Sequence, residues 1–258
     1  MSKPKIAVIW FPGMNCEQES KRACVAAGMD ADIVRWNNAK LERYDGYLLP
    51  GGWSFEDRIR AGVIASKDSL FDALKTEAKS GKPVLGICNG CQVLAETGLV
   101  PGIKPETQLA LAPNINPFVS GYYCTWVKVK HVGKRNAYNA FFKAGEILDL
   151  PIAHGEGRFI SAEKGLIEQL EKNGQIVFKY CNANGSVVHD FPVNPNGAVA
   201  NIAAVSNVKG NVLAIMPHPE RAFFKHQLKE KHMANYGDAM TLAPAAKLFE
   251  SMRESLKR

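Results

Sequence analysis

The chain has 258 residues, of which 46% are hydrophobic and 22% charged, and a formal net charge of +7. These values are typical of an ordinary globular enzyme. No apolar run is long enough for a membrane span and no block of Lys and Arg resembles a nucleic-acid-binding arm, so we expect neither partner. Six cysteines are too few for a disulfide scaffold, and no signal peptide precedes the first predicted strand, which together favour a reducing, cytoplasmic location.

Strands alternate with helices over the first hundred residues. The predicted strands are 5–11, 32–36, 45–49 and 84–87, and the predicted helices are 16–27 and 61–80. Asn15 is the expected N-cap of the first helix, and Gly28 its end. The alternation predicts a flavodoxin-like, doubly wound α/β sheet, in which the functional site lies beyond the carboxyl ends of the strands.

The pattern becomes antiparallel after Leu99. The predicted strands are 122–130, 151–159, 175–180, 201–206 and 211–216, and the predicted helices are 163–173 and 243–256. Because no repeat or linker interrupts the chain, we expect a single domain (1–258) with a mixed sheet. The most basic run of the chain, 221–232, is either a solvated helix face or a docking surface for a partner or a phosphorylated metabolite.

Cys88 lies in the stretch around which the chain is organised. It follows the apolar run 84–87 between Gly86 and Gly90, and a helix begins directly after it. This G-x-C-x-G at a strand-to-helix turn has the pattern of a nucleophile elbow. The glycines leave room for the turn and for a substrate, and the helix amino terminus favours a thiolate. We therefore predict that Cys88 is a nucleophile.

His218 is the candidate base for this thiol. Two prolines bracket it and hold its backbone extended, so that Glu220, two residues on, points the same way and can orient the imidazole. A casual His and Glu on a surface turn is the alternative. The order Cys, His, Glu after an elbow makes that alternative the weaker one.

Two backbone N–H groups are candidate oxyanion donors. One belongs to Asn89, directly after the nucleophile, and the other to Gly52, at the end of the neighbouring strand. The glycines before Trp53 could equally serve a tight turn, and both roles are compatible.

Cys88 and Cys91 also form a C-x-x-C pair. A redox pair would leave His218 and Glu220 without a role, and a zinc site would need a second thiol pair, which the chain lacks at that spacing. Cys91 is most simply a buried small residue, and Cys16 is interpreted as structural rather than as a second reactive thiol.

The segments 86–92 (G-I-C-N-G-C-Q) and 216–221 (M-P-H-P-E-R) resemble the class I, or triad, glutamine amidotransferases. Further segments, 11–16, 50–58 with 60–62, 153–158 and 194–197, are similar to the glutaminase subunits of phosphoribosylformylglycinamidine synthases. The resemblance extends from Lys5 to about Arg221. The chain continues past the shorter members of the family from about residue 223, which we interpret as a basic, helical C-terminal extension for partner docking.

This resemblance implies hydrolysis of L-glutamine to glutamate and ammonia through a cysteine thioester. The ammonia would pass to a large synthetase subunit that uses ATP and Mg²⁺ to make formylglycinamidine ribonucleotide in de novo purine biosynthesis. A small accessory subunit is also expected, with no cofactor or metal on this chain.

The resemblance also implies roles for individual residues. Cys88 would be the nucleophile, His218 the base and then the acid, and Glu220 its orienting group. Gly52 and Asn89 match the oxyanion donors, and Gln92 matches a position that contacts the substrate glutamine. His154, Glu156 and Arg158 match a loop near the site or the partner face.

Two positions depart from the family pattern. The family usually has Gly where this chain has Glu56, and Ser or Thr where it has Met14. A non-glycine residue at positive φ costs about 1 kcal/mol or more, so we expect the loop around Glu56 to be reshaped.

Two other functions remain open at this stage. The chain could be a thiol hydrolase or protease of similar fold, against which segments 11–13 and 154–158 argue. It could also be a catalytically silent regulatory subunit, against which the intact Cys88, His218 and Glu220 argue.

Overall fold

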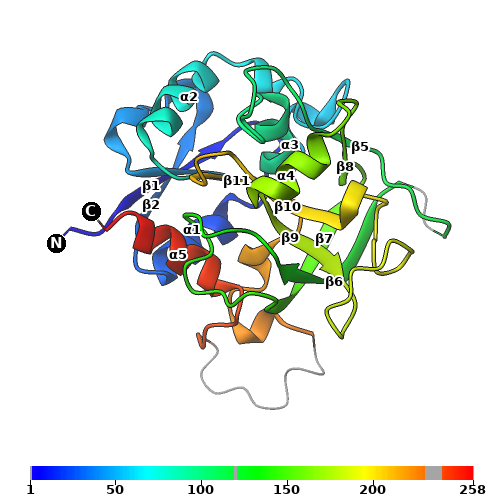
Figure 1. Ribbon diagram of the computed structural model, residues 1–258. Helices are drawn as coiled ribbons and strands as arrows, with labels where there is room; N and C mark the ends of the chain where they lie inside the picture. The colour runs from blue at the N-terminus through cyan, green and yellow to red at the C-terminus, as the bar shows by residue number, and fades with distance from the viewer. Residues whose placement is uncertain (1, 119–120, 230–239, 258) are drawn as a thin grey trace.

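The computed structural model describes residues 2–118, 121–229 and 240–257. A nine-stranded sheet organises it, in the order β2-β1-β3-β4-β11-β10-β9-β6-β7 (Figure 1). A second, two-stranded sheet pairs β5 (Ala110–Ala112) with β8 (Arg158–Ile160). No helix within the described ranges is long and apolar enough to cross a membrane.

One part of the large sheet is parallel. Its strands are β1 (Lys5–Trp10), β2 (Asp30–Arg35), β3 (Gly46–Leu49), β4 (Val84–Ile87) and β11 (Val212–Ile215). Strands β3, β4 and β11 are buried at every position, as expected for strands covered on both faces. The order 2-1-3-4-11 is the flavodoxin-like one, which confirms the predicted fold class.

Helices cover both faces of this parallel part. Figure 1 shows α1 (Glu17–Ala26) and α5 (Ala246–Ser255) on one face, and α2 (Leu70–Ser80) and α3 (Asn89–Glu96) on the other. The apolar residues of α2, spaced three and four apart, are buried, so the helix is amphipathic as its sequence predicts.

The other part of the sheet is antiparallel, which confirms the predicted change after Leu99. It contains β10 (Ile202–Ser206), β9 (Ile176–Cys181), β6 (Tyr123–His131) and β7 (Ile147–His154), and α4 (Leu166–Asn173) precedes β9. Burial alternates along β7, and this edge strand accommodates a proline, Pro151.

Two helix starts differ from the prediction. Helix α1 begins at Glu17 without a side-chain cap, and Asn15 Oδ1 instead accepts a hydrogen bond from Cys16 Sγ (3.4 Å). Helix α2 begins at Leu70 rather than near residue 61, because Gly62 has a φ of +78° and Asp68 Oδ1 accepts from Leu70 N–H (2.9 Å). The expected cap at Asn15 is therefore wrong, and the prediction for α2 missed the turn that precedes Leu70.

The C-terminal segment is partly integrated into the core. Phe223 and Phe224 are buried, and the ring of Phe223 lies 5.4 Å from that of Phe249 on α5. Between Phe224 and α5, the described residues form only a short 3₁₀ turn at 225–227. The described part of the segment is therefore not one continuous helix. Lys231 and His232 of the basic run lie outside the described residues, and its docking role stays a prediction.

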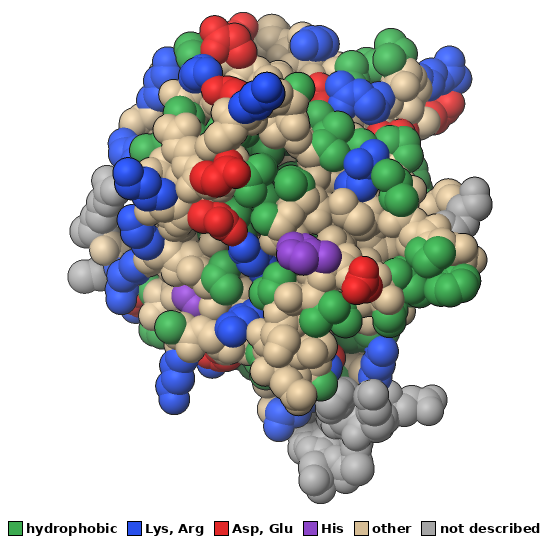
Figure 2. All heavy atoms as spheres, turned by 45° about the vertical axis from the view of Figure 1, so that its right-hand side comes forward, with side chains coloured by type: hydrophobic (Ala, Val, Ile, Leu, Met, Phe, Trp, Pro, Cys, Tyr) green, Lys and Arg blue, Asp and Glu red, His purple; other side chains and the backbone are tan. Residues whose placement is uncertain are grey.

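The surface view shows mixed charge. On the face in Figure 2, Lys and Arg side chains are interspersed with Asp and Glu, and hydrophobic side chains are exposed in several separate places. The excess of positive charge is therefore distributed over this face rather than gathered in one patch.

Candidate active site

Cys88 sits on a strained turn between β4 and α3. Its φ and ψ are 51° and −105°, a conformation that non-glycine residues adopt rarely, and its N–H donates to Ile215 O of β11 (2.8 Å). The turn is tight because α3 approaches the end of β3: a Cβ on Gly90 would lie 2.1 Å from Leu49 O. This glycine therefore gives room to the protein's own backbone, rather than to a substrate as the sequence analysis also proposed.

His218 and Glu220 form a buried pair. His218 Nδ1 lies 2.6 Å from Glu220 Oε1, and the two side chains are 2% and 0% exposed. The His218 N–H donates to Pro151 O of β7 (2.9 Å), which brings the antiparallel part of the sheet to the site. Glu220 reaches the ring from a 3₁₀ turn (Pro219–Arg221), not from an extended strand.

Glu220 controls the charge of the imidazole. Burial opposes the imidazolium most strongly, but the Glu220 carboxylate and the Cys88 sulfur outweigh burial and hold the pKa of His218 well above its ordinary value. Because Nδ1 faces the carboxylate, Nε2 is the nitrogen left for proton exchange, and it is buried without a hydrogen-bond partner.

A cavity of about 140 Å³ opens beside Cys88. Four predicted site residues, Cys88, Gly52, Gln92 and His154, line it together with Trp53, Asp57, Tyr122, Ala153, Gly155 and Glu156. Cys88 Sγ and Tyr122 Oη both donate to Ala153 O, at 3.7 and 2.8 Å. The structure thus brings the predicted nucleophile and the predicted binding residues to one small cavity.

The two predicted oxyanion donors are free to act. Within the described ranges, neither the Gly52 N–H nor the Asn89 N–H donates a hydrogen bond. The Asn89 side chain holds their surroundings in place, because its Oδ1 accepts from Ser54 N–H and its Nδ2 donates to Asp57 Oδ1, both at 3.0 Å. The loop after β3 is therefore tied to the start of α3.

Gln92 connects a third segment. Its Oε1 accepts from Asn89 Nδ2 (2.9 Å), and its Nε2 donates to Glu156 O (2.7 Å) in the loop after β7. Gln92 lines the cavity while fixing this loop, and its contact with a substrate stays a prediction. Arg158 does not line the cavity; its Nε donates to Pro113 O (2.9 Å).

His154 is neutral, unlike His218. Asn114 Oδ1 accepts from Gly157 N–H (3.0 Å) and lies 3.1 Å from His154 Nδ1, so Nδ1 is the protonated nitrogen. Burial and the charge of His218 lower the pKa of His154 to about 3. Its buried Nε2, without a partner, is an acceptor at the cavity wall.

The loop around Glu56 is not reshaped, so that expectation was wrong. Phe55, Glu56 and Asp57 have φ values of 52°, 62° and 50°, and Glu56 thus adopts the conformation that favours glycine. The Phe55 ring packs against those of Phe11 and Trp36, at 6.1 and 5.9 Å, and this anchoring offsets strain of about 1 kcal/mol per residue. The other departure, Met14, is buried opposite Gly52.

Sequence reasoning missed several residues of the site. Asp57 lines the cavity beside Glu156, which the sequence analysis did place in a loop near the site or the partner face, and burial together with the Glu156 charge raises the pKa of Asp57 to about 6. Cys16 and Arg221 lie next to the His218–Glu220 pair. All four belong to segments that carried the family resemblance, but only the folded structure shows which residues lie next to them.

Cys91 does not pair with Cys88. All six cysteines are free thiols, and burial, followed by the proximity of Cys88, holds the pKa of Cys91 well above its ordinary value. An inert, packed thiol is what the sequence analysis preferred over a redox partner.

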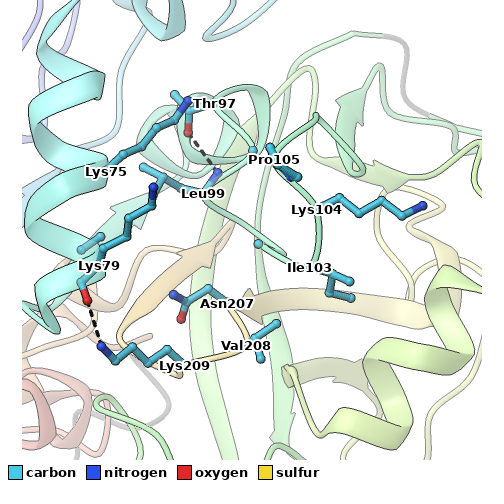
Figure 3. Close-up of a pocket in the computed structure, with 13 residues that line it drawn as sticks. Lys75, Lys79, Thr97, Leu99, Ile103, Lys104, Pro105, Asn207, Val208 and Lys209 are labelled. Atoms are coloured by element: carbon cyan, nitrogen blue, oxygen red, sulfur yellow. Dashed lines mark hydrogen bonds between the residues drawn. The ribbon is translucent and has the colours of Figure 1, made fainter.

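A larger cavity, of about 640 Å³, lies elsewhere (Figure 3). Lys75 and Lys79 of α2 extend over it, and the Lys209 ammonium donates to Lys79 O (2.9 Å). It shares no lining residue with the cavity beside Cys88 and contains no member of the predicted triad.

Comparison with known proteins agrees with this geometry. Residues 3–255 match the family model described as a CobB/CobQ-like glutamine amidotransferase domain. The chain belongs to this glutamine amidotransferase family. The amidotransferase is 46% identical to the phosphoribosylformylglycinamidine synthase subunit PurQ of Methanothrix thermoacetophila, over 98% of each chain. It is 42% identical to the PurQ subunit of Aquifex aeolicus, over 84% of this chain and 91% of the relative.

A solved structure supports the same assignment. One chain of the Thermotoga maritima PurLQS structure matches the amidotransferase with a TM-score of 0.76 and 30% identity, over 99% of this chain and 100% of that one. The fold and the enzyme class expected from the sequence, an α/β glutamine amidotransferase, are therefore confirmed.

Proposed function

We propose that this glutamine amidotransferase is the glutaminase subunit of a phosphoribosylformylglycinamidine synthase. The observation that carries the proposal is the near full-length similarity to PurQ subunits combined with an elbow cysteine, a buried His–Glu pair and a cavity that opens beside the cysteine. The reaction of this chain would be glutamine plus water to glutamate plus ammonia.

In the first half-reaction, Cys88 attacks the side-chain carbonyl carbon of glutamine. His218 Nε2 takes the thiol proton, and the N–H groups of Gly52 and Asn89 stabilise the oxyanion. The imidazolium then gives its proton to the leaving amide nitrogen, ammonia departs, and a thioester to Cys88 remains.

In the second half-reaction, water attacks the thioester carbon. His218 Nε2 takes a proton from the water and returns it to the departing Cys88 sulfur, and glutamate is released. Glu220 stays ionised throughout, because its role is to hold the tautomer and stabilise the imidazolium. In this proposal, His154 Nε2 and the Gln92 carboxamide would contact the bound glutamine.

The partner calls form part of the same proposal. A large synthetase subunit would receive the ammonia and use ATP and Mg²⁺ to convert formylglycinamide ribonucleotide to the amidine, and a small third subunit would complete the assembly. This chain would hold no cofactor. We place the reaction in the cytoplasm, because the six free thiols suit a reducing compartment.

The test measures glutamate release from glutamine by this chain alone, and then with the synthetase subunit, ATP, Mg²⁺ and the ribonucleotide. Cys88→Ala should abolish glutamine-dependent amidine synthesis and leave synthesis from added ammonium intact. Cys91→Ala is the matched control, three residues along on α3, and should retain glutamine hydrolysis.

The alternatives make different predictions. A catalytically silent regulatory subunit would release no glutamate under either condition. A thiol hydrolase or protease would turn over acyl or peptide substrates at least as well as glutamine and would gain nothing from the synthetase. Either result would refute the proposal.

A further inference from the structure

The larger cavity, of about 640 Å³, has no role in the proposed reaction, and we call it the lysine cavity. Its walls are the C-terminal half of α2, the loop 97–105 after α3, and the turn 207–209 between β10 and β11. This turn precedes β11, whereas Cys88 follows β4, which runs parallel to β11. The lysine cavity therefore lies at the opposite edge of the sheet from the nucleophile. Its volume is typical of small-molecule sites, which range from about 300 to 1,000 Å³.

Hydrogen bonds between the walls fix the shape of the lysine cavity. Gln175 Nε2, which is buried, donates to Pro101 O (2.9 Å) in the loop and to Ser206 O (3.0 Å) directly before the turn. On the other side of the turn, Asn211 Nδ2 donates to Ala78 O of α2 (2.7 Å). Because the three walls are already tied together, a ligand would not have to order them on binding.

The charge of the lysine cavity has one sign. Among the described residues that line it, none is Asp or Glu, and the charged ones are Lys75, Lys79, Lys104 and Lys209. The Lys104 ammonium pairs with Glu163, and the Lys209 ammonium donates to Lys79 O (2.9 Å). In the part of the chain that the structure describes, the ammonium groups of Lys75 and Lys79 have neither an ion pair nor a hydrogen bond.

The two unpaired lysines are placed to act together. They lie four residues apart, on one face of α2, and Figure 3 shows both side chains extending from this helix towards the segment that contains Thr97 and Leu99. Lys104 extends away from them on the far side of the cavity. The lysine cavity therefore offers two neighbouring positive charges to an anion at its α2 side.

The rest of the lining is apolar or already hydrogen-bonded. Its apolar side chains are Ala78, Leu99, Ile103, Pro105 and Val208. Thr97 Oγ1 donates to Leu94 O (2.9 Å), and Asn207 Oδ1 accepts from the N–H groups of Asn211 and Val212, both at 3.0 Å. Val208 is 61% exposed, so an apolar ligand has surface left to cover. The two uncharged polar side chains are engaged within the protein, which leaves charge and shape as the means of recognition.

We propose that the lysine cavity binds a phosphate monoester with an aromatic or apolar body, the chemistry of a nucleoside monophosphate. The phosphate lies between Lys75 and Lys79, and the body covers Leu99, Ile103 and Val208. A phosphate monoester carries a charge of about −1.5 to −2 at pH 7, which matches two ammonium groups. Burial of the body removes apolar surface of both partners from water.

The test is isothermal titration calorimetry of the full chain with AMP as the probe. Ribose 5-phosphate, inorganic phosphate and adenosine each lack one part of AMP, and each should bind about tenfold more weakly or worse. GMP should bind within about threefold of AMP, because no free side-chain amide or hydroxyl reads the edge of the base. Equal affinities for inorganic phosphate and AMP would overturn the proposal, since the apolar wall would then contribute nothing.

Two variants locate the site. Lys75→Gln combined with Lys79→Gln should weaken AMP binding about tenfold or more. Val208→Glu, which places a carboxylate in the exposed turn, should weaken it as well. The control combines Lys67→Gln with Lys172→Gln, which removes two exposed lysines outside the lysine cavity and changes the net charge equally.

The control double variant should keep the AMP affinity of the parent chain. Equal losses in the two double variants, or no binding of AMP by the parent chain at about 1 mM, would refute the proposal. The measurement needs neither glutamine nor a partner subunit, so its outcome is independent of the proposed function.

Discussion

Two buried histidines lie near Cys88 in opposite charge states: His154 lines the small cavity beside it, and His218 lies behind that cavity, next to Gly51. His218 faces a carboxylate, Glu220, and its pKa is raised, whereas His154 faces a carboxamide, Asn114, and its pKa falls to about 3. Both rings are fully buried, and burial disfavours the imidazolium in each. The difference teaches that the group at Nδ1, and not the depth of burial, decides which histidine can carry a proton beside Cys88.

Glu220→Gln should have the largest effect, because it gives His218 the kind of partner that His154 has. Burial would then lower the pKa of His218 below its ordinary value, and the ring would be a weaker base for the Cys88 thiol. We expect kcat for glutamine hydrolysis to fall about 10³- to 10⁴-fold, as when the orienting carboxylate of a triad becomes an amide. Glu168→Gln on α4 is the control. A loss below tenfold would show that another group fixes the His218 proton.

Asn114→Asp makes the reverse exchange at His154. The new carboxylate should raise the pKa of His154 into the range that NMR titration of its ring can follow. A second imidazolium near His218 would lower the pKa of His218, and a change of one unit corresponds to about a tenfold loss of activity at neutral pH. Asn184→Asp, in an exposed turn, controls for the added charge. If His154 still titrated near pH 3, the comparison between the two rings would fail.

Asp57→Asn tests the cavity wall where Asp57 faces a second carboxyl group, that of Glu156. Its effect on turnover should be the smallest of the three. The Asp57 pKa of about 6, against 3.8 ordinarily, means that the folded chain binds this proton more tightly than the unfolded chain. The contribution of Asp57 to stability therefore falls as the pH rises from about 4 to 6. The amide keeps the acceptor for Asn89 and removes the buried charge.

We accordingly expect Asp57→Asn to raise Tm by a few degrees at pH 7.5, with the gain disappearing near pH 4 and little change in kcat. Thermal unfolding at several pH values measures both. Asp72→Asn, in the first turn of α2, should show no such gain. A Tm difference that does not vary with pH would mean that Asp57 acts through the loop conformation and not through its charge.

The parts of the molecule differed in how much their sequence revealed. The parallel strands could be predicted because β3, β4 and β11 are short apolar runs, and the carboxyl ends of parallel strands meet at one edge of the sheet. The nucleophile and the base follow from this topology together with the G-x-C-x-G turn at Cys88 and the prolines around His218.

Contacts between distant segments could not be predicted in the same way. The wall of the cavity depends on β7 approaching the segment after β11, although three strands of the sheet lie between them. The hydrogen bonds of Asn114 to His154 and of Arg221 to Cys16 connect residues 40 and 205 positions apart, and no local pattern marks them. The left-handed Glu56 was missed for a related reason: the rings that hold its loop come from Phe11, directly after β1, and from Trp36, in the turn after β2.

The hydrogen bond from His218 N–H to Pro151 O has a consequence outside catalysis. Strand β7 is the edge of the nine-stranded sheet, and an open edge is a template on which a second chain can add a strand. At Pro151 the ring nitrogen offers no donor, and the carbonyl is occupied by the segment that carries the base. A variant that loosens this segment, such as Pro217→Gly, should therefore favour association between chains as well as slower turnover, so that loss of activity and loss of monodispersity would appear together.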